Sequence, residues 1–486
     1  MINNMLQTHP QNLPNLSGVI DEYHRQHNWL LSLIRDPTGA RDFEEKSPEV
    51  RLQQYRTQLA RTADFLEFAG NPHTRYKSIH VAGTSGKGSV VAMMAAVLQQ
   101  CRQRTGFHIS PYLQICNEKL IVDGQMIPPS EFSALIEQFK GLYHNWLAAD
   151  RAFNDLRYGE AWVILTYLWL ANRNVDWAVI ETGLGGRYDP TNVLPSNLAV
   201  ITNVNFDHVK SLGPDLLNIA RHKAGIIKPD GLVVTSETNP DVLAVIEAEA
   251  AQKNATLFRL NHEFSYSVEQ TGANQTILSV QAPGHHYRHI RLNIPGQFQH
   301  ANAALAVAGL DVLAQRESLP NLAQGIQRGL AAVEFPGRME LIQQEPPVIL
   351  DGAHNPHKMA ALVRSVRALY PHRRITALFG MIRVKNARAV LEVLAPEVSR
   401  FVVSAPRVYG KPALPPEDMA HIIEELSPNT ELRVVDGVQN AVRAALQTVA
   451  PDELLLITGS LYLVGEAREL WFPQDEILRQ LEMTQI

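Results

Sequence analysis

The sequence has very few cysteines. Cys101 and Cys116 are the only two among 486 residues, which excludes a disulfide framework and is typical of proteins from a reducing compartment. Neither cysteine has further ligand residues at metal-binding spacing, so we expect both to be structural.

Long apolar runs are also missing. The longest, residues 90–98 and 161–171, are too short to span a bilayer and predict buried helices. Residues 1–18 lack the basic start and the apolar stretch of a secretory signal. We therefore expect a cytoplasmic protein that has no membrane partner.

The chain carries no strong excess of charge of either sign. Its formal net charge is −5, and 19% charged against 45% hydrophobic residues is an ordinary balance for a globular protein. This balance gives no reason to expect a nucleic-acid partner, so an anionic substrate would have to be bound by local lysines and arginines. A chain of 486 residues exceeds what one hydrophobic core usually supports, which predicts two or three domains.

Helical and strand-like patterns alternate from about residue 48 onward. In the first part we predict strands at 105–109, 176–181 and 198–204, a hairpin over 119–127 turned at Asp123-Gly124, and helices at 50–68, 130–145, 158–171, 301–315 and 322–330. In the second part we predict strands at 347–351, 375–379, 401–404, 432–435 and 454–458, with helices between them. Strands separated by helices predict parallel sheets in both parts.

These patterns divide the chain into three predicted regions. Residues 1–45 are polar, with one helical patch near 19–34, and form an N-terminal extension of unknown role. Residues 46–334 and 335–486 form two α/β domains, and Phe335-Pro336-Gly337 marks the boundary between them.

A glycine-rich turn, Gly83-Thr84-Ser85-Gly86-Lys87-Gly88-Ser89, lies between an apolar strand-like run and a helical run. In such a turn the backbone N–H groups and the positive end of the helix face phosphate oxygens, and the lysine reaches the outer phosphates of a nucleotide. The turn departs from the strict P-loop pattern, because Val81 stands where that pattern has its first glycine and Gly88 where it has Ser or Thr. Taken alone, the turn fits helix–strand packing as well as it fits phosphate binding.

Two other predicted strands also end in polar residues. Glu181 closes one of them, and the segment 203–208, which includes Asp207 and His208, follows the other. Because ligands bind beyond the carboxyl ends of parallel strands, we expect these side chains beside the glycine-rich turn. A carboxylate and an imidazole near a triphosphate suit Mg²⁺, although either residue alone fits a loop cap or a surface histidine as well.

A series of short motifs follows between about residues 70 and 470. They are His80-Val81-Ala82-Gly83-Thr84-Ser85-Gly86-Lys87-Gly88-Ser89, Ser110-Pro111-Tyr112-Leu113, Glu181-Thr182-Gly183-Leu184-Gly185-Gly186-Arg187, Asn205-Phe206-Asp207-His208, Lys223-Ala224-Gly225-Ile226-Ile227-Lys228, Pro336-Gly337-Arg338-Met339-Glu340, Asp351-Gly352-Ala353-His354-Asn355-Pro356 and Gly459-Ser460-Leu461-Tyr462-Leu463-Val464-Gly465. In these motifs and their order the chain resembles the folylpolyglutamate synthase / dihydrofolate synthase family, within the Mur ligase superfamily of ATP-dependent amide ligases.

The resemblance implies both a fold and a reaction. The fold would be α/β, with a Mur-ligase-like P-loop ATPase domain on a mostly parallel sheet and a smaller Rossmann-like C-terminal glutamate ligase domain. In the reaction, a substrate carboxylate attacks the γ-phosphate of ATP, and the amine of L-glutamate displaces phosphate from the acyl phosphate. The acceptor would be a pteroate or a folate, and the enzyme would act as a monomer because the family's site lies between domains of one chain.

The resemblance also assigns roles to residues of the matching motifs. It implies that Lys87, His208 and Lys223 are catalytic, and that Ser110, Glu181 and His208 bind Mg²⁺, with two ions in the site. The implied ATP-binding residues are Gly83, Thr84, Ser85, Gly86, Lys87, Gly88, Ser89, Asn302, Arg338, Asp351 and His354. We expect the second domain to close over the nucleotide by a hinge motion at 335–337.

Two of these assignments have plain structural alternatives. Lys223 matches the lysine that the family carries as a carbamate, but it is equally a candidate for a solvated lysine where Gly225 ends a helix. His222 stands where family members usually have glutamate, so the surroundings of this lysine differ from theirs. Arg338 either contacts phosphate or forms a salt bridge at the hinge.

The acceptor side departs most from the family pattern. Relatives usually read Leu-Thr-x-Phe-Glu where this chain has Leu156-Arg157-Tyr158-Gly159-Glu160, so glycine replaces an aromatic ring suited to stacking. A later Asp-Lys-Asp motif is Val384-Lys385-Asn386 here, and Lys385 can still meet a carboxylate. The residues that we expect to bind the acceptor are Arg157, Tyr158, Glu160, Arg187 and Asp189.

Three interpretations follow. The chain is a folate ligase, a ligase of the same mechanism for another carboxylate, or a nucleotide-binding protein without ligase activity. Retention of the candidate catalytic residues argues against the last, and substrate-stimulated ADP release discriminates it from the other two.

Overall fold

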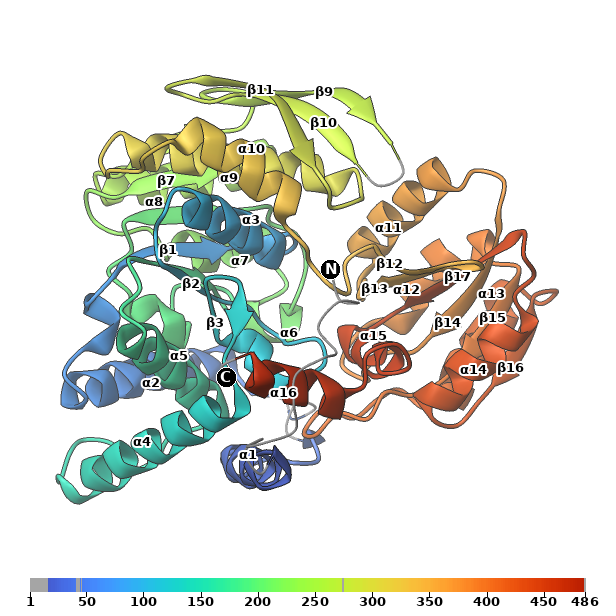
Figure 1. The fold of residues 1–486 in the computed structure, drawn as a ribbon, viewed down its shortest axis with the longest axis horizontal. Helices are drawn as coiled ribbons and strands as arrows, with labels where there is room; N and C mark the ends of the chain where they lie inside the picture. Colours follow the sequence, from blue (N-terminus) through green and yellow to red (C-terminus); the bar gives the residue numbers. More distant parts are fainter. Residues whose placement is uncertain (1–15, 41–43, 45, 273–274, 485–486) are drawn as a thin grey trace, which may run out of the picture.

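Helices and strands alternate through two lobes of the molecule (Figure 1). This computed structural model describes residues 16–40, 44, 46–272 and 275–484. The strands of the first lobe are β1 (Lys77–Ala82), β2 (Thr105–His108), β3 (Ile121–Val122), β4 (Gln125–Met126), β5 (Trp177–Glu181), β6 (Leu198–Ile201), β7 (Leu232–Thr235), β8 (Thr256–Arg259), β9 (Ser265–Thr271), β10 (Thr276–Gln281) and β11 (His286–Leu292). Its α-helices are α1 (Leu16–Leu31), α2 (Pro48–Phe68), α3 (Lys87–Gln100), α4 (Pro129–Ala148), α5 (Tyr158–Asn172), α6 (Val209–Leu212), α7 (Leu216–Ala224), α8 (Pro240–Gln252), α9 (Phe298–Ala314) and α10 (Leu322–Ala332), with 3₁₀ turns η2 (Pro72–Thr74), η3 (Cys116–Lys119) and η4 (Pro190–Val193).

The second lobe begins after the Phe335-Pro336-Gly337 segment. Its strands are β12 (Glu340–Gln344), β13 (Pro347–Asp351), β14 (Arg374–Phe379), β15 (Arg400–Val403), β16 (Glu431–Val434) and β17 (Glu453–Thr458). The helices that accompany and follow them are α11 (Pro356–Leu369), α12 (Ala387–Leu394), η5 (Ala395–Glu397), α13 (Pro416–Leu426), α14 (Val438–Thr448), α15 (Leu461–Arg468) and α16 (Gln474–Met483).

Each lobe has one mostly parallel sheet. The order is β4-β3-β2-β5-β1-β6-β7-β8 in the first lobe and β12-β13-β17-β14-β15-β16 in the second, while β11-β10-β9 form a small separate sheet. Strands β2, β5, β1, β6, β7 and β8 run parallel, and β3 and β4 form an antiparallel hairpin. The hairpin turns at Asp123 and Gly124, whose positive φ values of 52° and 77° confirm the sequence-based prediction.

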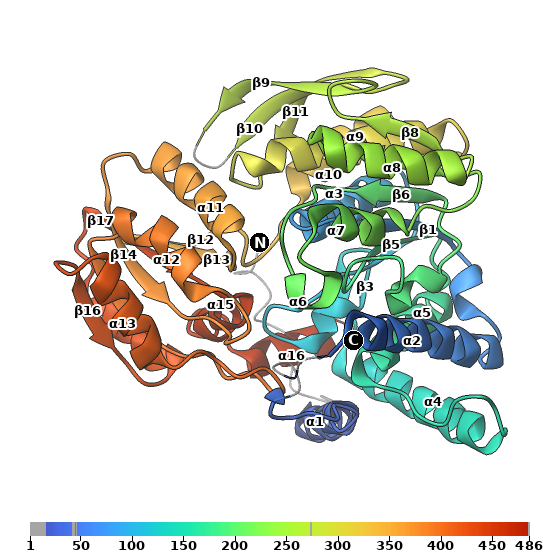
Figure 2. The same ribbon diagram turned by 180° about the vertical axis from the view of Figure 1, so that it is seen from behind.

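The central strands are apolar because helices cover both faces of the sheet. On one face, α3, α9 and α10 pack with β1 and β6 in a single hydrophobic core, and the small sheet β9–β11 covers α9 and α10 from outside (Figure 1). On the other face, α4 and α5 form a second core with β5 (Figure 2). Helix α5 is buried all round, as its apolar run predicts, and no helix in the described ranges is long and apolar enough to cross a membrane.

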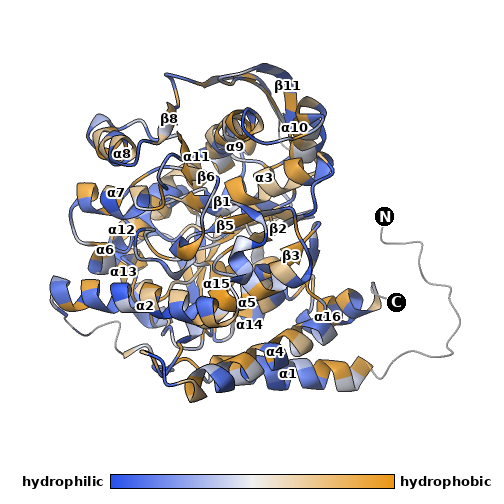
Figure 3. Ribbon diagram, turned by 90° about the vertical axis from the view of Figure 1, so that its left-hand side faces the viewer, coloured by the Kyte–Doolittle hydropathy of each residue, from blue (hydrophilic) through white to orange (hydrophobic). Residues whose placement is uncertain are grey.

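Helix α1 is packed into the first lobe. Ile20, Tyr23 and Leu30 are buried in the core that α4 and α5 form, and the Tyr23 hydroxyl donates a hydrogen bond of 2.7 Å to Asn117 Oδ1. Figure 3 shows that α1 and α4 carry both hydrophilic and hydrophobic residues, as helices with one buried face do. The remainder of the predicted N-terminal extension includes residues 1–15, 41–43 and 45, which lie outside the described residues.

The last helix returns from the second lobe to the first. Helix α16 packs against α1 and α4, and the Ser130 backbone N–H donates to Glu482 Oε2 at 3.0 Å. Helix α16 thus adds a contact between the lobes to the 335–337 connection.

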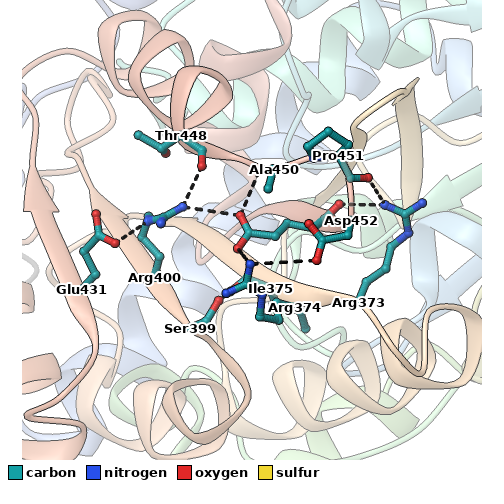
Figure 4. Close-up of polar contacts among 11 residues, drawn as sticks. Arg373, Arg374, Ile375, Ser399, Arg400, Glu431, Thr448, Ala450, Pro451 and Asp452 are labelled. Atoms are coloured by element: carbon teal, nitrogen blue, oxygen red, sulfur yellow. Dashed lines mark hydrogen bonds and ion pairs between the residues drawn. The ribbon is translucent and has the colours of Figure 1, made fainter.

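In the second lobe the predicted strands are present within one residue at each end. Strand β12 was missed, because its sequence Glu-Leu-Ile-Gln-Gln is polar and it pairs antiparallel at the sheet edge. At the amino ends of β14 and β15, Arg374 and Arg400 pair with Glu453, and Arg400 also pairs with Glu431 (Figure 4). These ion pairs occupy the end of the sheet opposite to the ligand-binding carboxyl ends, so they serve structure.

Candidate active site

A cavity of about 1100 Å³ lies between the two lobes. Many of the residues around it follow the carboxyl ends of strands in both sheets, the expected place for a ligand. Among the residues predicted from sequence, it is lined by Gly83, Thr84, Ser85, Gly86, Lys87, Gly88, Ser89, Ser110, Arg157, Tyr158, Glu181, His208, Lys223, Asn302, Arg338, Asp351 and His354.

The glycine-rich turn joins β1 to the N-terminus of α3 at Lys87. Gly83 and Gly86 have φ values of 146° and 81°, a left-handed backbone that favours glycine. The segment after β6 holds the turn: the Thr84 N–H donates to the Asn203 carbonyl at 2.7 Å, and the Ser85 N–H to Asn203 Oδ1 at 2.9 Å. The loop is therefore preorganised, with a helix N-terminus directed at the cavity.

Gly88 replaces the usual Ser or Thr for a steric reason. A Cβ at this position would lie 2.7 Å from Cζ of Phe335, the residue that begins the connection to the second lobe. The phosphate loop and the connection are thus in direct contact, and a side chain at position 88 would require Phe335 or the loop to shift.

Glu181 lies at the centre of the site. Its Oε1 is 3.5 Å from Lys87 Nζ, and its Oε2 accepts a hydrogen bond of 3.1 Å from the Ser110 backbone N–H. The strand register explains the proximity, because Glu181 on β5 pairs with Val81 on β1, shortly before the phosphate loop. Within the described ranges no three His, Cys, Asp or Glu side chains cluster as a metal site, so a metal ion here would need ligands from a bound phosphate.

Asp207 joins the two lobes through Lys385. Its Oδ1 lies 2.7 Å from Lys385 Nζ, and both side chains are largely buried. Burial acts to raise the pKa of Asp207, but His208 and Lys385 outweigh burial and hold this pKa well below its ordinary value. Lys385 thus meets a carboxylate from the other lobe, as its sequence position allowed.

His208 follows directly, in a left-handed conformation with φ 50°. Its side chain is 48% exposed, and its Nε2 lies 4.0 Å from Asp207 Oδ1. Partial burial of the ring, together with nearby lysines, lowers the pKa of His208 to about 4, although the adjacent Asp207 acts to raise it. The imidazole is neutral at pH 7 and retains a lone pair for a metal ion or a proton.

Lys223 is buried at the end of α7, which excludes the solvated alternative. Lys223 is only 4% exposed, and its Nζ donates a hydrogen bond of 2.7 Å to the Gly83 carbonyl. Burial and the neighbouring Lys87 hold the pKa of Lys223 well below its ordinary value. This amine therefore loses its proton more readily than a solvated lysine does.

Arg338 and Asp351 both belong to the second lobe, Arg338 directly after the lobe connection and Asp351 at the end of β13. The Asp351 carboxylate accepts hydrogen bonds from the backbone N–H groups of Met339 (3.0 Å) and Ala353 (2.9 Å), so it orders the turn that carries Arg338. Arg338 has no ion pair among the residues that the structure describes, and its guanidinium lies 5.9 Å from the Phe335 ring centroid, beside the cavity. The salt-bridge alternative for Arg338 is therefore wrong.

His354 and Lys358 form a second basic pair in the same lobe. His354 Nδ1 lies 2.8 Å from the Gly352 carbonyl, and Lys358 Nζ lies 3.2 Å from His354 Nε2. Burial lowers the pKa of Lys358 to about 7. Sequence reasoning missed Lys358, although its position in the first turn after the Asp351–Pro356 motif was a usable signal.

Asn302 on α9 lies directly against the phosphate loop. A Cβ on Gly86 would overlap its side-chain amide, and its Nδ2 donates to Gln299 Oε1 at 2.8 Å. Gln299 in turn donates to Ser89 Oγ at 3.2 Å. Helix α9 therefore positions the loop from the side, and an adenine contact by Asn302 stays a prediction.

On the acceptor side, Arg157 and Tyr158 begin α5 and line the cavity. A Cβ on Gly159 would have no neighbour within 4 Å, so the place of the family's aromatic ring is open space. The missing ring thus enlarges this end of the cavity.

Three predicted acceptor residues lie outside the cavity, which corrects the sequence-based expectation. Glu160 is 2% exposed and pairs with Arg61 at 2.6 Å. Arg187 pairs with Glu249 at 2.5 Å, and Asp189 accepts hydrogen bonds from the backbone of Leu184 (2.6 Å) and Thr191 (3.0 Å). These three residues stabilise the fold of the loops around the site and do not line the cavity. A sequence motif alone does not distinguish such a structural role from contact with a ligand.

Two domain models match the chain. The Mur ligase middle domain matches residues 81–310, and the Mur ligase glutamate ligase domain matches residues 337–461. The segment between the two matches, residues 311–336, includes Phe335 of the lobe connection.

Full-length relatives match as well. Folylpolyglutamate synthase of Lacticaseibacillus casei is 33% identical over 85% of this chain and 95% of its own. Dihydrofolate synthase/folylpolyglutamate synthase of Mycobacterium tuberculosis is 31% identical over 88% of this chain and 92% of its own. The solved structure of Mycobacterium tuberculosis folylpolyglutamate synthase complexed with ADP superimposes with a TM-score of 0.84 at 29% identity, covering 94% of this chain and 99% of that one. With these matches over nearly its whole length, the chain belongs to the folylpolyglutamate synthase / dihydrofolate synthase family of Mur ligases.

Proposed function

We propose that this protein is an ATP-dependent ligase that joins L-glutamate to the carboxylate of a folate-type acceptor through an acyl phosphate, releasing ADP and phosphate. The observation that carries the proposal is the convergence of a preorganised phosphate loop, Glu181 and the cations of both lobes on one cavity. That arrangement suits a reaction in which two anions, a carboxylate and a triphosphate, must be brought together.

In the first step the acceptor carboxylate attacks the γ-phosphate of ATP. The backbone N–H groups of the loop, the α3 N-terminus and Lys87 hold the phosphates. Arg338 from the second lobe adds a cation that faces the cavity without a competing partner among the described residues. These groups neutralise the charge that develops on the transferred phosphoryl group.

The donor set fits Mg²⁺ at Glu181. A buried carboxylate beside Ser110 offers oxygen ligands, which Mg²⁺ prefers, and phosphate oxygens of the nucleotide would complete the shell. His208, neutral at pH 7, would serve as a further ligand. When bound, Mg²⁺ polarises the phosphoryl group and reduces repulsion between the reacting anions.

In the second step the amine of L-glutamate attacks the acyl carbonyl, and phosphate leaves. We assign Lys223 a role as a carbamate: its amine nitrogen forms a bond to CO₂ and releases a proton, converting a buried cation site into an anion that can hold a second metal ion. The burial of Lys223 and its lowered pKa support this assignment.

Closure of the second lobe would complete the site. Arg338, Asp351, His354 and Lys385 all belong to this lobe, so their distance to the phosphate loop depends on the hinge at 335–337. We further propose that the enzyme acts as a monomer in a reducing compartment, since one chain supplies both sides of the cavity and both cysteines are free and buried.

The test is ADP release by the purified protein with Mg-ATP, bicarbonate and L-glutamate. Dihydropteroate, tetrahydrofolate and no acceptor are compared, and products are identified by mass spectrometry. A glutamylated product is expected with at least one folate-type acceptor, and Lys87→Ala should reduce its formation by about 10³-fold. The exposed Lys77→Ala is the matched control and should retain activity. ATP binding without acceptor-stimulated ADP release would refute the proposal.

A further inference from the structure

Lys119 is a buried cation without an ion pair among the described residues. The residue is 9% exposed and lines the cavity, and its Nζ lies 5.0 Å from the centroid of the Trp162 ring. Among the described residues, its ammonium has neither an ion pair nor a hydrogen bond. A buried, unpaired ammonium is costly, so its presence at a cavity wall indicates a ligand that compensates the charge.

A second cation from the other lobe faces the same region. Lys411 lies in the segment between β15 and α13, lines the cavity, and donates a hydrogen bond of 2.6 Å to the Tyr462 hydroxyl. Burial and the nearby Lys411 lower the pKa of Lys119 to about 8, whereas Glu181 acts in the opposite direction. Two lysines that repel each other, neither of them in an ion pair among the described residues, form a site for an anion.

The walls of this part of the cavity include aromatic side chains. Tyr112, Tyr158 and Tyr462 all line this end of the cavity. Glu118, the one carboxylate next to Lys119 in sequence, is directed away, since it accepts hydrogen bonds from the backbone N–H groups of residues 113–115. The region therefore suits a ligand that is partly aromatic and carries an anionic group.

We propose that Lys119 and Lys411 form a second carboxylate subsite, which binds the α-carboxylate of a glutamyl residue already present on the acceptor. The inference rests on the proposed function. A pteroate has one carboxylate, and the reaction places it at the γ-phosphate beside Glu181. An acceptor that ends in glutamate presents its reactive γ-carboxylate there and has a second carboxylate nearby on the same residue. The subsite thus favours folates that already carry glutamate over pteroates.

The experiment compares two acceptors with the full-length enzyme. We measure kcat/KM for tetrahydrofolate monoglutamate and for dihydropteroate, and the KM of L-glutamate with each, for the wild type, Lys119→Met and Lys411→Met. Each variant should lose about 10- to 100-fold in kcat/KM for tetrahydrofolate, mainly through KM, the loss expected for one charge-assisted hydrogen bond. For dihydropteroate the change should stay below about threefold. Lys119→Arg should keep most of the tetrahydrofolate activity.

Lys140→Met is the matched control, because Lys140 Nζ lies 4.9 Å from the Trp29 ring centroid but outside the cavity. This variant should leave kcat/KM unchanged for both acceptors. Equal losses of kcat/KM for both acceptors would overturn the proposed subsite, and so would a raised KM for L-glutamate with both acceptors. A wild type that uses dihydropteroate alone would also overturn it. A wild type that glutamylates neither acceptor would instead refute the proposed function on which the subsite depends. Lys411 is exposed, so its variant tests the subsite even if Lys119→Met does not fold.

Discussion

Lys385 Nζ and Asp207 Oδ1 lie 2.7 Å apart and form an ion pair between the two lobes at the edge of the cavity. Each residue follows a strand end in its own sheet, and the pair exists only when the lobes are in this relative position. Both side chains are largely buried, so removing one of them would leave an unpaired buried charge. This costs more free energy than breaking an exposed salt bridge does.

Lys385→Met should impair catalysis by weakening lobe closure. The coupling energy between Lys385 and Asp207 should be about 1–3 kcal/mol, which corresponds to a loss of about 5- to 150-fold in kcat/KM. A double-mutant cycle with Asp207→Asn, measured by ADP release, gives this energy. Arg388→Met, which breaks an exposed ion pair with Glu425 in the same lobe, is the control and should have little effect. Additive losses in the cycle would show that the pair does not act as a unit.

Gly88→Ser, which restores the hydroxyl common in P-loops, should lower activity. The new Cβ would meet Phe335 Cζ at 2.7 Å, so either the loop or the lobe connection must shift. We expect a loss of about 10- to 100-fold in ADP release, since small displacements in a preorganised site are costly. The double variant Gly88→Ser with Phe335→Ala removes the clash and should recover much of the activity. Full activity in the single variant would mean that Phe335 moves freely.

Activity should depend on CO₂ if Lys223 is carbamylated. Removing CO₂ from the buffers should reduce ADP release, and bicarbonate should restore it. Lys223→Ala should lose about 10²-fold or more and should not respond to bicarbonate. Enrichment with ¹³C-bicarbonate should produce a carbamate carbon signal in the wild type alone. Activity that is independent of CO₂, without such a signal, would contradict the assignment.

The KM for tetrahydrofolate should rise with pH above about 8. The pKa of Lys119 is lowered to about 8 by burial and Lys411, so the ammonium loses its charge as pH passes that value and the subsite loses its attraction for a carboxylate. The rise should be about tenfold between pH 7 and 9, and it should be absent for dihydropteroate. Lys119→Arg should abolish this rise, because a guanidinium stays charged over the range. A parallel rise for both acceptors would assign the titration to another group.

Much of the first lobe was predictable from local pattern. The apolar runs of β5 and β6 predict buried parallel strands, and the glycine-rich turn predicts the start of α3. The strand predicted at 198–204 ends already at Ile201, because the Thr202 side chain turns to the phosphate loop and donates to the Ser85 carbonyl at 2.7 Å. Such boundaries depend on a partner that is distant in sequence.

The acceptor side was less predictable. Glu160 and Arg157 lie three residues apart in one motif, yet Arg157 lines the cavity while Glu160 is buried against Arg61. Neither the residue type nor the spacing separates these outcomes, since both residues are charged and both lie at the start of α5.

The sequence by itself determined the alternation of strands and helices, the phosphate loop and the family, because these depend on neighbouring residues and on motif order. Only the tertiary structure decided which charges meet. Lys119 with Lys411, and Asp207 with Lys385, come together through the packing of two lobes, and each pair joins positions with no shared local pattern. Burial then sets the chemistry, since the same lysine is a charged group in water and a neutral amine or an anion-binding site once it is enclosed.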